Sequence, residues 1–164
     1  MPRAIAILEV LRYKLAVAQL RHAGDPLKLA HAVRHLGDAW RRAGQPADAE
    51  LCFVEALSIC RRDAHASPLD VANALRSFAV LEDDERHAEA AQRLWQEARD
   101  LHVACGVQAG VAESAARLAL LARAAGDGPL YRARLAEAQA AADAARDPET
   151  LAYVREVSER LGEA

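Results

Sequence analysis

The chain has 164 residues, of which 52% are hydrophobic and only 4% are aromatic, and its formal net charge is −3. This is the length of one ordinary domain, with enough apolar residues to bury a continuous core. The small negative charge offers no general attraction to nucleic acid or to anionic lipid, because both normally require a basic surface. Helix-favouring Ala, Leu, Arg, Glu and Gln dominate, whereas β-branched residues are scarce. We therefore expect an all-α protein that binds neither nucleic acid nor a membrane.

Glycine and proline interrupt the chain at regular intervals, for example at Gly24-Asp25-Pro26 and Gly44-Gln45-Pro46. Glycine commonly ends a helix and proline commonly begins one, so these sites predict helix boundaries. The segments between them are about 15 to 20 residues long and carry apolar residues at helical spacing. They predict eight helices, over residues 3–23, 26–43, 46–63, 67–84, 87–104, 108–125, 129–146 and 148–162.

The pattern of large and small residues on these helices repeats along the chain. Such self-similarity is typical of a solenoid, in which hairpins stack because one short helix pair cannot bury both of its faces. The first set is Val33, Leu36, Gly37, Trp40, Ala49, Phe53 and Ala56. It recurs 42 residues later as Leu75, Phe78, Ala79, Glu82, Ala91, Trp95 and Ala98. It recurs again as Ala115, Leu118, Ala119, Ala122, Tyr131, Leu135 and Ala138.

The first set, written as Leu36-Gly37-x2-Trp40-x3-Gly44-x4-Ala49-x3-Phe53-x2-Ala56, resembles the tetratricopeptide repeat. Its 42-residue spacing is similar to the variety found in kinesin light chains. The resemblance covers residues 26–146 and implies a right-handed superhelical array of about three tetratricopeptide-like helical hairpins with a further helix at each end. We expect a single domain over residues 1–164, made of an N-terminal helix (1–24), three repeats (25–66, 67–107 and 108–147) and a C-terminal capping helix (148–164).

Three residues depart from the repeat pattern. Glu82 replaces the aromatic residue, Arg86 replaces the turn glycine, and Tyr131 occupies a position for a small residue, which indicates a third crossing that is splayed or repacked. Helix 3–23 does not share the pattern. We interpret it as an N-terminal cap, as the second half of a diverged hairpin, or as a helix for self-association.

The resemblance implies that the first helices of the hairpins line a concave groove in which a partner would lie. The outward faces of these helices are polar, and arginine recurs on each of them, which suits bidentate binding of carboxylates and so an acidic peptide. The alternative is a solvated face whose arginines are neutralised by neighbouring acidic residues. Surface ion pairs of this kind contribute little to stability. The candidate groove residues are His31, Arg34, His35, Asp38, Arg41, Asn73, Arg76, Ser77, Glu113 and Arg117.

The groove does not reproduce either of two recognition patterns known for this kind of repeat. Asp38 stands where the carboxylate clamp of chaperone-binding tetratricopeptide domains has Asn, and Glu113 stands where that clamp has Lys. The asparagine pair of kinesin light chain repeats is also replaced, at Arg34-His35 and Arg76-Ser77. We therefore do not expect recognition of a chaperone C-terminus or of kinesin cargo.

No motif points to catalysis, and we expect no enzyme activity, no cofactor and no metal. His31 and His35 have metal-bridging spacing, but no third ligand accompanies them. The acidic run 82–85 is interpreted as a solvated helix end. The three cysteines, which show no CxxC spacing, are expected to be small buried residues of a reduced cytoplasmic protein: Cys52, Cys60 and Cys105.

The sequence thus predicts a cytoplasmic protein-interaction module, an adaptor or regulatory domain whose groove takes a peptide or helix of another protein. The alternative is a structural domain that self-associates, or that docks in a larger regulatory assembly, through helix 3–23 or its terminal face. The Ala- and Arg-rich composition is typical of a GC-rich bacterial genome.

Overall fold

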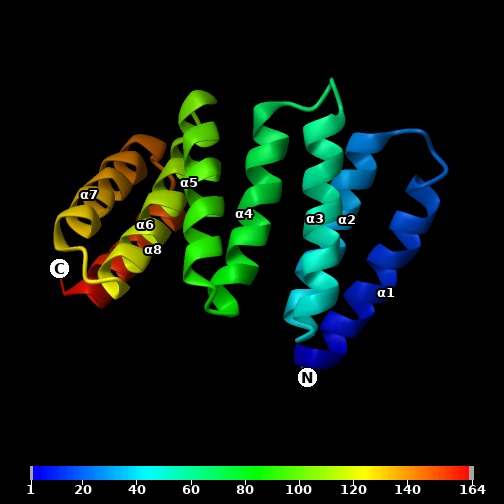
Figure 1. Cartoon of the computed structure of the whole chain (residues 1–164), viewed down its shortest axis with the longest axis horizontal. Coiled ribbons are helices and arrows are strands. Elements are labelled where there is room, and N and C mark those ends of the chain that lie inside the picture. The colour runs from blue at the N-terminus through cyan, green and yellow to red at the C-terminus, as the bar shows by residue number, and fades with distance from the viewer. Residues whose placement is uncertain (1, 163–164) are drawn as a thin grey trace. The chain divides into compact units, whose positions relative to one another are not determined.

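The computed structural model describes residues 2–162, which form eight α-helices and no strand within that range (Figure 1). The all-α prediction and all eight predicted helices are confirmed. The largest difference in a boundary is at the end of the first helix, which stops at Leu20. The helices are α1 (Pro2–Leu20), α2 (Pro26–Arg42), α3 (Pro46–Arg62), α4 (Pro68–Asp84), α5 (Ala88–Ala104), α6 (Gln108–Ala124), α7 (Gly128–Ala145) and α8 (Pro148–Leu161).

Local sequence signals account for these boundaries. Proline lies in the first turn of α2, α3, α4, α7 and α8, where its missing N–H costs nothing. Ser67 and Asp70 form a capping box at the start of α4, each side chain accepting a hydrogen bond from the other's backbone N–H. Gly44 and Gly126 take the left-handed conformation after α2 and α6, and Arg86 takes it after α4 with a φ of 62°.

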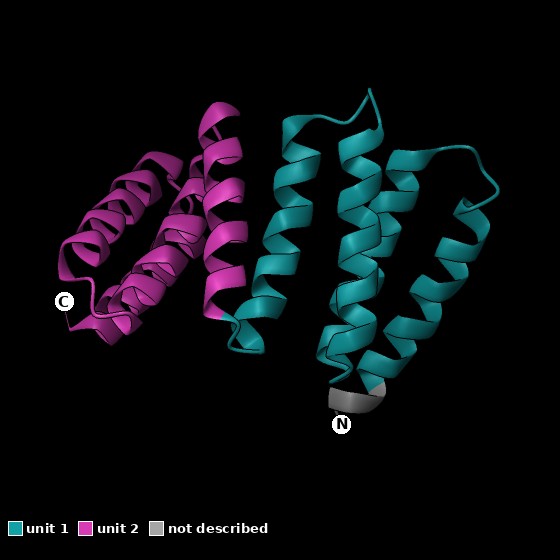
Figure 2. Ribbon diagram, viewed as in Figure 1, with its two compact units in different colours: residues 1–87 teal, residues 88–164 magenta. Residues whose placement is uncertain are grey.

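The helices fall into two compact units, residues 1–87 with α1–α4 and residues 88–164 with α5–α8 (Figure 2). In the first unit each helix packs against the next, and α2 also packs against α4. In the second unit α5 packs against α6, α6 against α7, and α8 against both α6 and α7. The helices thus pack as sequential hairpins, like a tetratricopeptide array. The single domain over 1–164 stays a prediction.

The core of the first unit depends on a close approach between α2 and α3. A Cβ atom at Gly37 would lie 2.6 Å from Cε1 of Phe53, whose side chain is fully buried. Phe53 also meets Phe78 of α4, with ring centroids 6.1 Å apart. The glycine of the repeat pattern is therefore needed because the aromatic ring of the partner helix occupies the space of a side chain.

The core of the second unit is built largely from alanine. Ala115 and Ala119 of α6 and Ala138 of α7 are fully buried in one cluster with Leu135. Tyr131 is itself buried, and the guanidinium carbon of Arg123 lies 5.3 Å from its ring centroid. Because α6 and α7 pack more extensively than any other pair in the described range, the crossing is not splayed; the other expectation, that it is repacked, stays a prediction.

The departure at Glu82 has a local explanation. The Glu82 side chain is buried, and its carboxylate lies 2.9 Å from Nδ1 of the His87 ring. The backbone N–H of His87 also donates to the backbone carbonyl of Glu82 at 2.9 Å. A buried carboxylate needs such a partner.

Among the described helices, none is both long and apolar enough to cross a membrane.

Candidate functional site

The candidate groove residues of the first unit lie where α2 contacts α4. Three pairs of side chains connect the two helices. His31 Nε2 lies 2.9 Å from Asp70 Oδ1, Arg34 donates to Ser77 Oγ at 3.4 Å, and Arg41 donates to Asp84 at 2.6 Å. We call this set of residues, His31, Arg34, His35, Asp38, Arg41, Asn73, Arg76 and Ser77, the α2–α4 face.

Arg34 is held more loosely than Arg41, whose contact also joins the two helices. Its guanidinium binds two neutral groups, Ser77 Oγ at 3.4 Å and His35 Nε2 at 3.1 Å, and its nearest carboxylate oxygen, on Asp38, is 3.6 Å away. Arg41 instead has a carboxylate at 2.6 Å. Short hydrogen bonds to a charged partner are much stronger than long ones to neutral groups. Arg34 therefore has more to gain than Arg41 from a carboxylate brought by a partner.

The environment of His35 keeps its ring neutral. The ring stacks on Tyr13 of α1 with centroids 5.5 Å apart, and burial together with the charge of Arg34 lowers its pKa. A neutral ring can accept the hydrogen bond from Arg34, because an imidazolium has only donors. His35 thus helps to place the Arg34 guanidinium without competing for an acidic ligand.

The remaining groove residues are divided between the two units. Asn73 and Arg76 of α4 are half-buried, whereas Ser77 is only 2% exposed and lies beneath Arg34 rather than outward as expected. Glu113 and Arg117 belong to α6 in the second unit. The guanidinium of Arg117 lies 5.8 Å from the ring centroid of Trp95 and 5.7 Å from that of Tyr153, an environment in which it supports packing.

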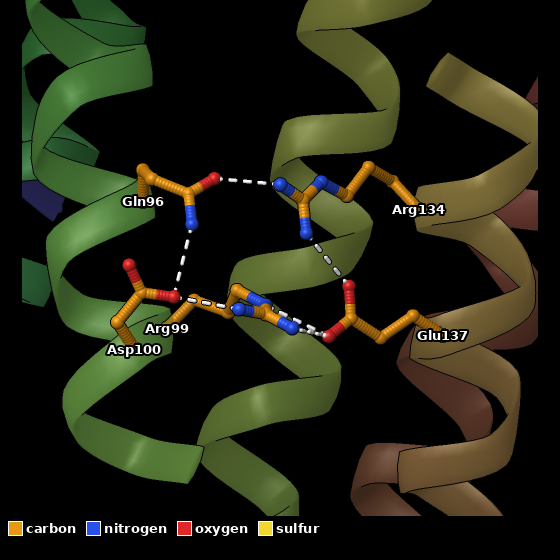
Figure 3. A network of polar contacts seen from close by, with 5 residues as sticks. All are labelled: Gln96, Arg99, Asp100, Arg134 and Glu137. Atoms are coloured by element: carbon orange, nitrogen blue, oxygen red, sulfur yellow. Dashed lines mark hydrogen bonds and ion pairs between the residues drawn. The ribbon is translucent and has the colours of Figure 1, made fainter. Parts of the chain in front are cut away.

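Sequence reasoning missed a polar network that connects α5 and α7 (Figure 3). Arg99 donates from Nε to Glu137 at 2.7 Å and from Nη1 to Asp100 at 2.6 Å. Arg134 donates to Glu137 at 2.9 Å and to Gln96 at 2.7 Å. Burial opposes ionisation of Asp100, but hydrogen bonds from Gln96 and Arg99 outweigh it and lower its pKa. The signal in the sequence was polar residues three and four apart on α5, at Gln96, Arg99 and Asp100, and three apart on α7, at Arg134 and Glu137.

Two of the hollows in the second unit are lined in part by α7. A cavity of about 130 Å³ beneath the network is lined by Gln96, Leu118, Leu121, Leu130 and Arg134, among others. A groove of about 380 Å³ between α7 and α8 is lined by Gln139, Asp143, Leu151, Val154 and Arg155, among others. Both mix apolar and polar side chains, and neither gathers a set of groups with evident chemistry.

The histidines and cysteines singled out in the sequence occupy separate places in the described structure. His31 is engaged by Asp70 and His35 by Arg34, and no group of three or more potential ligands that could hold a metal ion occurs in this part of the chain. Cys60 is buried and Cys52 half-buried, but the expectation of burial is wrong for Cys105, which is exposed in the turn after α5.

Comparison with known proteins gives a match at the level of the fold. No family model matches the sequence, and no curated protein is significantly similar to it. The structure matches that of BtubC (BKLC) from P. vanneervenii with a TM-score of 0.71 and 18% sequence identity. The fold is that of a tetratricopeptide-like array. The match covers 93% of this chain but only 61% of BtubC, a kinesin-light-chain-like tetratricopeptide protein, and at this identity it concerns the fold alone.

Proposed function

We propose that the chain is a protein-interaction module, an adaptor or regulatory domain, whose α2–α4 face binds an acidic segment of another protein. The observation that carries this proposal is the geometry of Arg34. Its side chain lies on the first helix of a hairpin, 19% exposed, with neutral hydrogen-bond partners at 3.1 and 3.4 Å and only a long ion pair, to Asp38 at 3.6 Å.

A partner carboxylate would improve this arrangement. The guanidinium has five N–H donors in a planar fork that matches two carboxylate oxygens, and a bidentate pair at about 2.8 Å is roughly twice as strong as a neutral hydrogen bond. Partial burial strengthens the attraction further, because fewer water molecules screen it. Arg76 occupies the same position in the next repeat, 42 residues later, and so offers a second cation for an extended acidic segment.

The fold supports a protein as the partner class. Tetratricopeptide-like arrays are typically non-catalytic, and a protein-interaction role is plausible for this one. A polar face formed by α2 and α4, the first helices of two successive hairpins, suits an extended peptide or a helix, which can contact both repeats. Binding through exposed and half-exposed charges would weaken as salt is added.

The test is an array of random-sequence peptides of graded acidity, probed with the wild-type chain, Arg34→Gln and an Arg34→Gln/Arg76→Gln double variant. We expect wild type to select acidic peptides, and the single variant to bind the selected peptides about tenfold more weakly, as loss of a charged hydrogen bond would require. Arg93→Gln is the matched control, because Arg93 is an exposed arginine of α5 outside the face.

The proposal fails if wild type shows no preference for acidic peptides, or if Arg34→Gln and Arg93→Gln bind the selected peptides equally well. Circular dichroism of each variant shows whether it is folded. Arg117 is left unchanged in these variants, because its guanidinium lies between two aromatic rings and its replacement would disturb packing in the second unit.

A further inference from the structure

The helix α1 has one buried face and one exposed apolar face. Ala6, Val10 and Val17 are buried against α2. The opposite side carries five of the nine large apolar side chains that are exposed among the described residues, each between 52% and 66% exposed. We call these five residues the α1 surface: Ile5, Ile7, Leu8, Leu11 and Leu15.

The helix α1 does not reproduce the repeat pattern, but its position before α2 explains why this surface is apolar. Three residues of the α1 surface have buried counterparts 42 residues later, in α3. These pairs are Ile7 and Ala49, Leu11 and Phe53, and Leu15 and Leu57. Those α3 residues are buried, since α3 has α2 on one side and α4 on the other. The helix α1 has α2 on one side, and no described helix of its own unit covers the other. The α1 surface therefore has the character of an interface between helices.

The spacing of the leucines fits another helix rather than an extended peptide. Leu8, Leu11 and Leu15, followed by Ala18, are three, four and three residues apart, the spacing of a coiled-coil seam. Ile5 and Ile7 flank the N-terminal half of this seam, and the exposed cations Arg12 and Lys14 flank the C-terminal half. The partner should thus be a helix that is itself apolar along one face.

We propose that the partner is the α1 surface of a second copy of the chain, with the two α1 helices antiparallel about a twofold axis. A seam of this kind is self-complementary, and a twofold arrangement closes at the dimer. In the antiparallel register that sets Leu8 of one copy beside Leu11 of the other, the cations of the two copies are separated, and the long side chains of Arg12 and Lys14 lie beside the isoleucines of the other copy.

Other surfaces of the chain fit the α1 surface less well. The exposed face of α8 is charged, and the remaining large exposed apolar residues are scattered over three other helices. The charged face consists of Arg155, Glu156, Glu159 and Arg160, and the scattered residues are Leu51, Val54, Val103 and Leu130. A head-to-tail contact between α1 and α8 would therefore bury charges against leucine.

The apolar area that the α1 surface can bury indicates a weak dimer. Five side chains that are 52–66% exposed, at roughly 100 Å² for complete burial of a Leu or Ile, supply about 300 Å² of apolar surface per copy. Since interfaces are a little over half apolar, this corresponds to roughly 1,000 Å² in total, the lower limit for a specific interface. We expect a dissociation constant in the micromolar range, on the order of 1–100 µM.

The experiment is sedimentation velocity of the full chain from about 1 µM to about 1 mM, in reducing buffer because the thiol of Cys105 is exposed. Wild type is expected to shift from the 17.7 kDa monomer toward twice that mass. The triple variant Leu8→Gln/Leu11→Gln/Leu15→Gln is expected to associate at least tenfold more weakly, because it removes the seam from exposed positions where glutamine is compatible with a helix. Leu51→Gln/Val54→Gln, on exposed positions of α3, is the matched control and should dimerise like wild type.

A wild-type chain that stays monomeric over the whole range overturns the proposal, as does a triple variant that dimerises like wild type. Assembly beyond the dimer overturns the twofold arrangement. The dimer should depend little on salt, whereas marked strengthening by salt would show that the cations face each other and that the helices are parallel. None of these outcomes bears on the α2–α4 face, which lies outside the residues changed.

Discussion

Replacing Gly37 with alanine tests the close approach between α2 and α3. Two effects oppose each other in this substitution. Alanine in a helix interior is favoured over glycine by about 1 kcal/mol. The new Cβ, however, would lie 2.6, 2.9 and 3.0 Å from Cε1, Cδ1 and Cζ of Phe53, roughly 1 Å closer than carbon atoms normally pack.

The Phe53 ring is fully buried and cannot move into solvent, so α2 and α3 must separate. Overpacking of this kind costs about 1–3 kcal/mol, and contact with three ring atoms places Gly37→Ala in the upper part of that range. We therefore expect a net loss of roughly 1–2 kcal/mol in the free energy of unfolding, after the gain in helix propensity is subtracted.

Urea denaturation followed by circular dichroism measures this loss. Gly128→Ala is the control, because its Cβ would lie 3.6 Å from the nearest atom, an ordinary contact. Its stability should stay within about 0.5 kcal/mol of wild type. A double-mutant cycle with Phe53→Leu should show that the smaller side chain recovers at least about 1 kcal/mol of the loss. The reasoning is refuted if Gly37→Ala stabilises the chain, or if the two substitutions are additive.

Three further predictions follow from the caps and thiols. Arg86→Gly should raise the free energy of unfolding by about 0.5–1 kcal/mol, since Arg86 has a φ of 62° that glycine adopts without strain; an unchanged urea midpoint would contradict this. Hydrogen bonds from Ser67, with help from His31, lower the pKa of Asp70, so its ionised form stabilises the fold above the ordinary pKa of Asp, and this stability is lost as the pH falls through the lowered pKa. The melting temperature should therefore decrease as the pH is lowered below about 4, and this decrease should be less steep in Asp70→Asn. Cys105 should be alkylated well before Cys52, since Cys105 is exposed while burial raises the pKa of Cys52 to about 11; equal rates, measured by mass spectrometry, would argue against the fold around Cys52.

The sequence was sufficient to predict the helices because their boundaries are set by local chemistry. Proline in the first turn, a capping side chain and a left-handed glycine act over a few residues, so they can be recognised without knowing the fold. The end of α5 at Ala104 was also predicted, and the error at Cys105 was to expect burial of a residue that lies just after this end, in a turn where Gly106 takes a φ of 70°.

The pairing of polar side chains between helices was much harder to predict. The repeat implied that α2 lies beside α4, but not that Arg34 would reach Ser77, 43 residues later, or that His31 would reach Asp70, 39 residues later. These offsets differ because each long side chain reaches its partner along a different direction. The same difficulty hid the pairing of Arg99 with Glu137, and a repeat period alone cannot resolve it.

The two terminal helices differ in a way that bears on the role of α1. The end units of a solenoid need a polar outer face, and α8 meets this requirement with Arg155, Glu156 and Glu159. The helix α1 does not, because Leu8 and Leu11 are 66% and 59% exposed. Of the three interpretations of the first helix, self-association gives these exposed leucines a partner, whereas a simple cap leaves them in contact with solvent. The leucine-to-glutamine triple variant separates self-association from the other two interpretations: with a cap or a hairpin half, wild type and variant would both be monomers, whereas with a self-association helix the variant would lose the dimer while the monomer kept its fold.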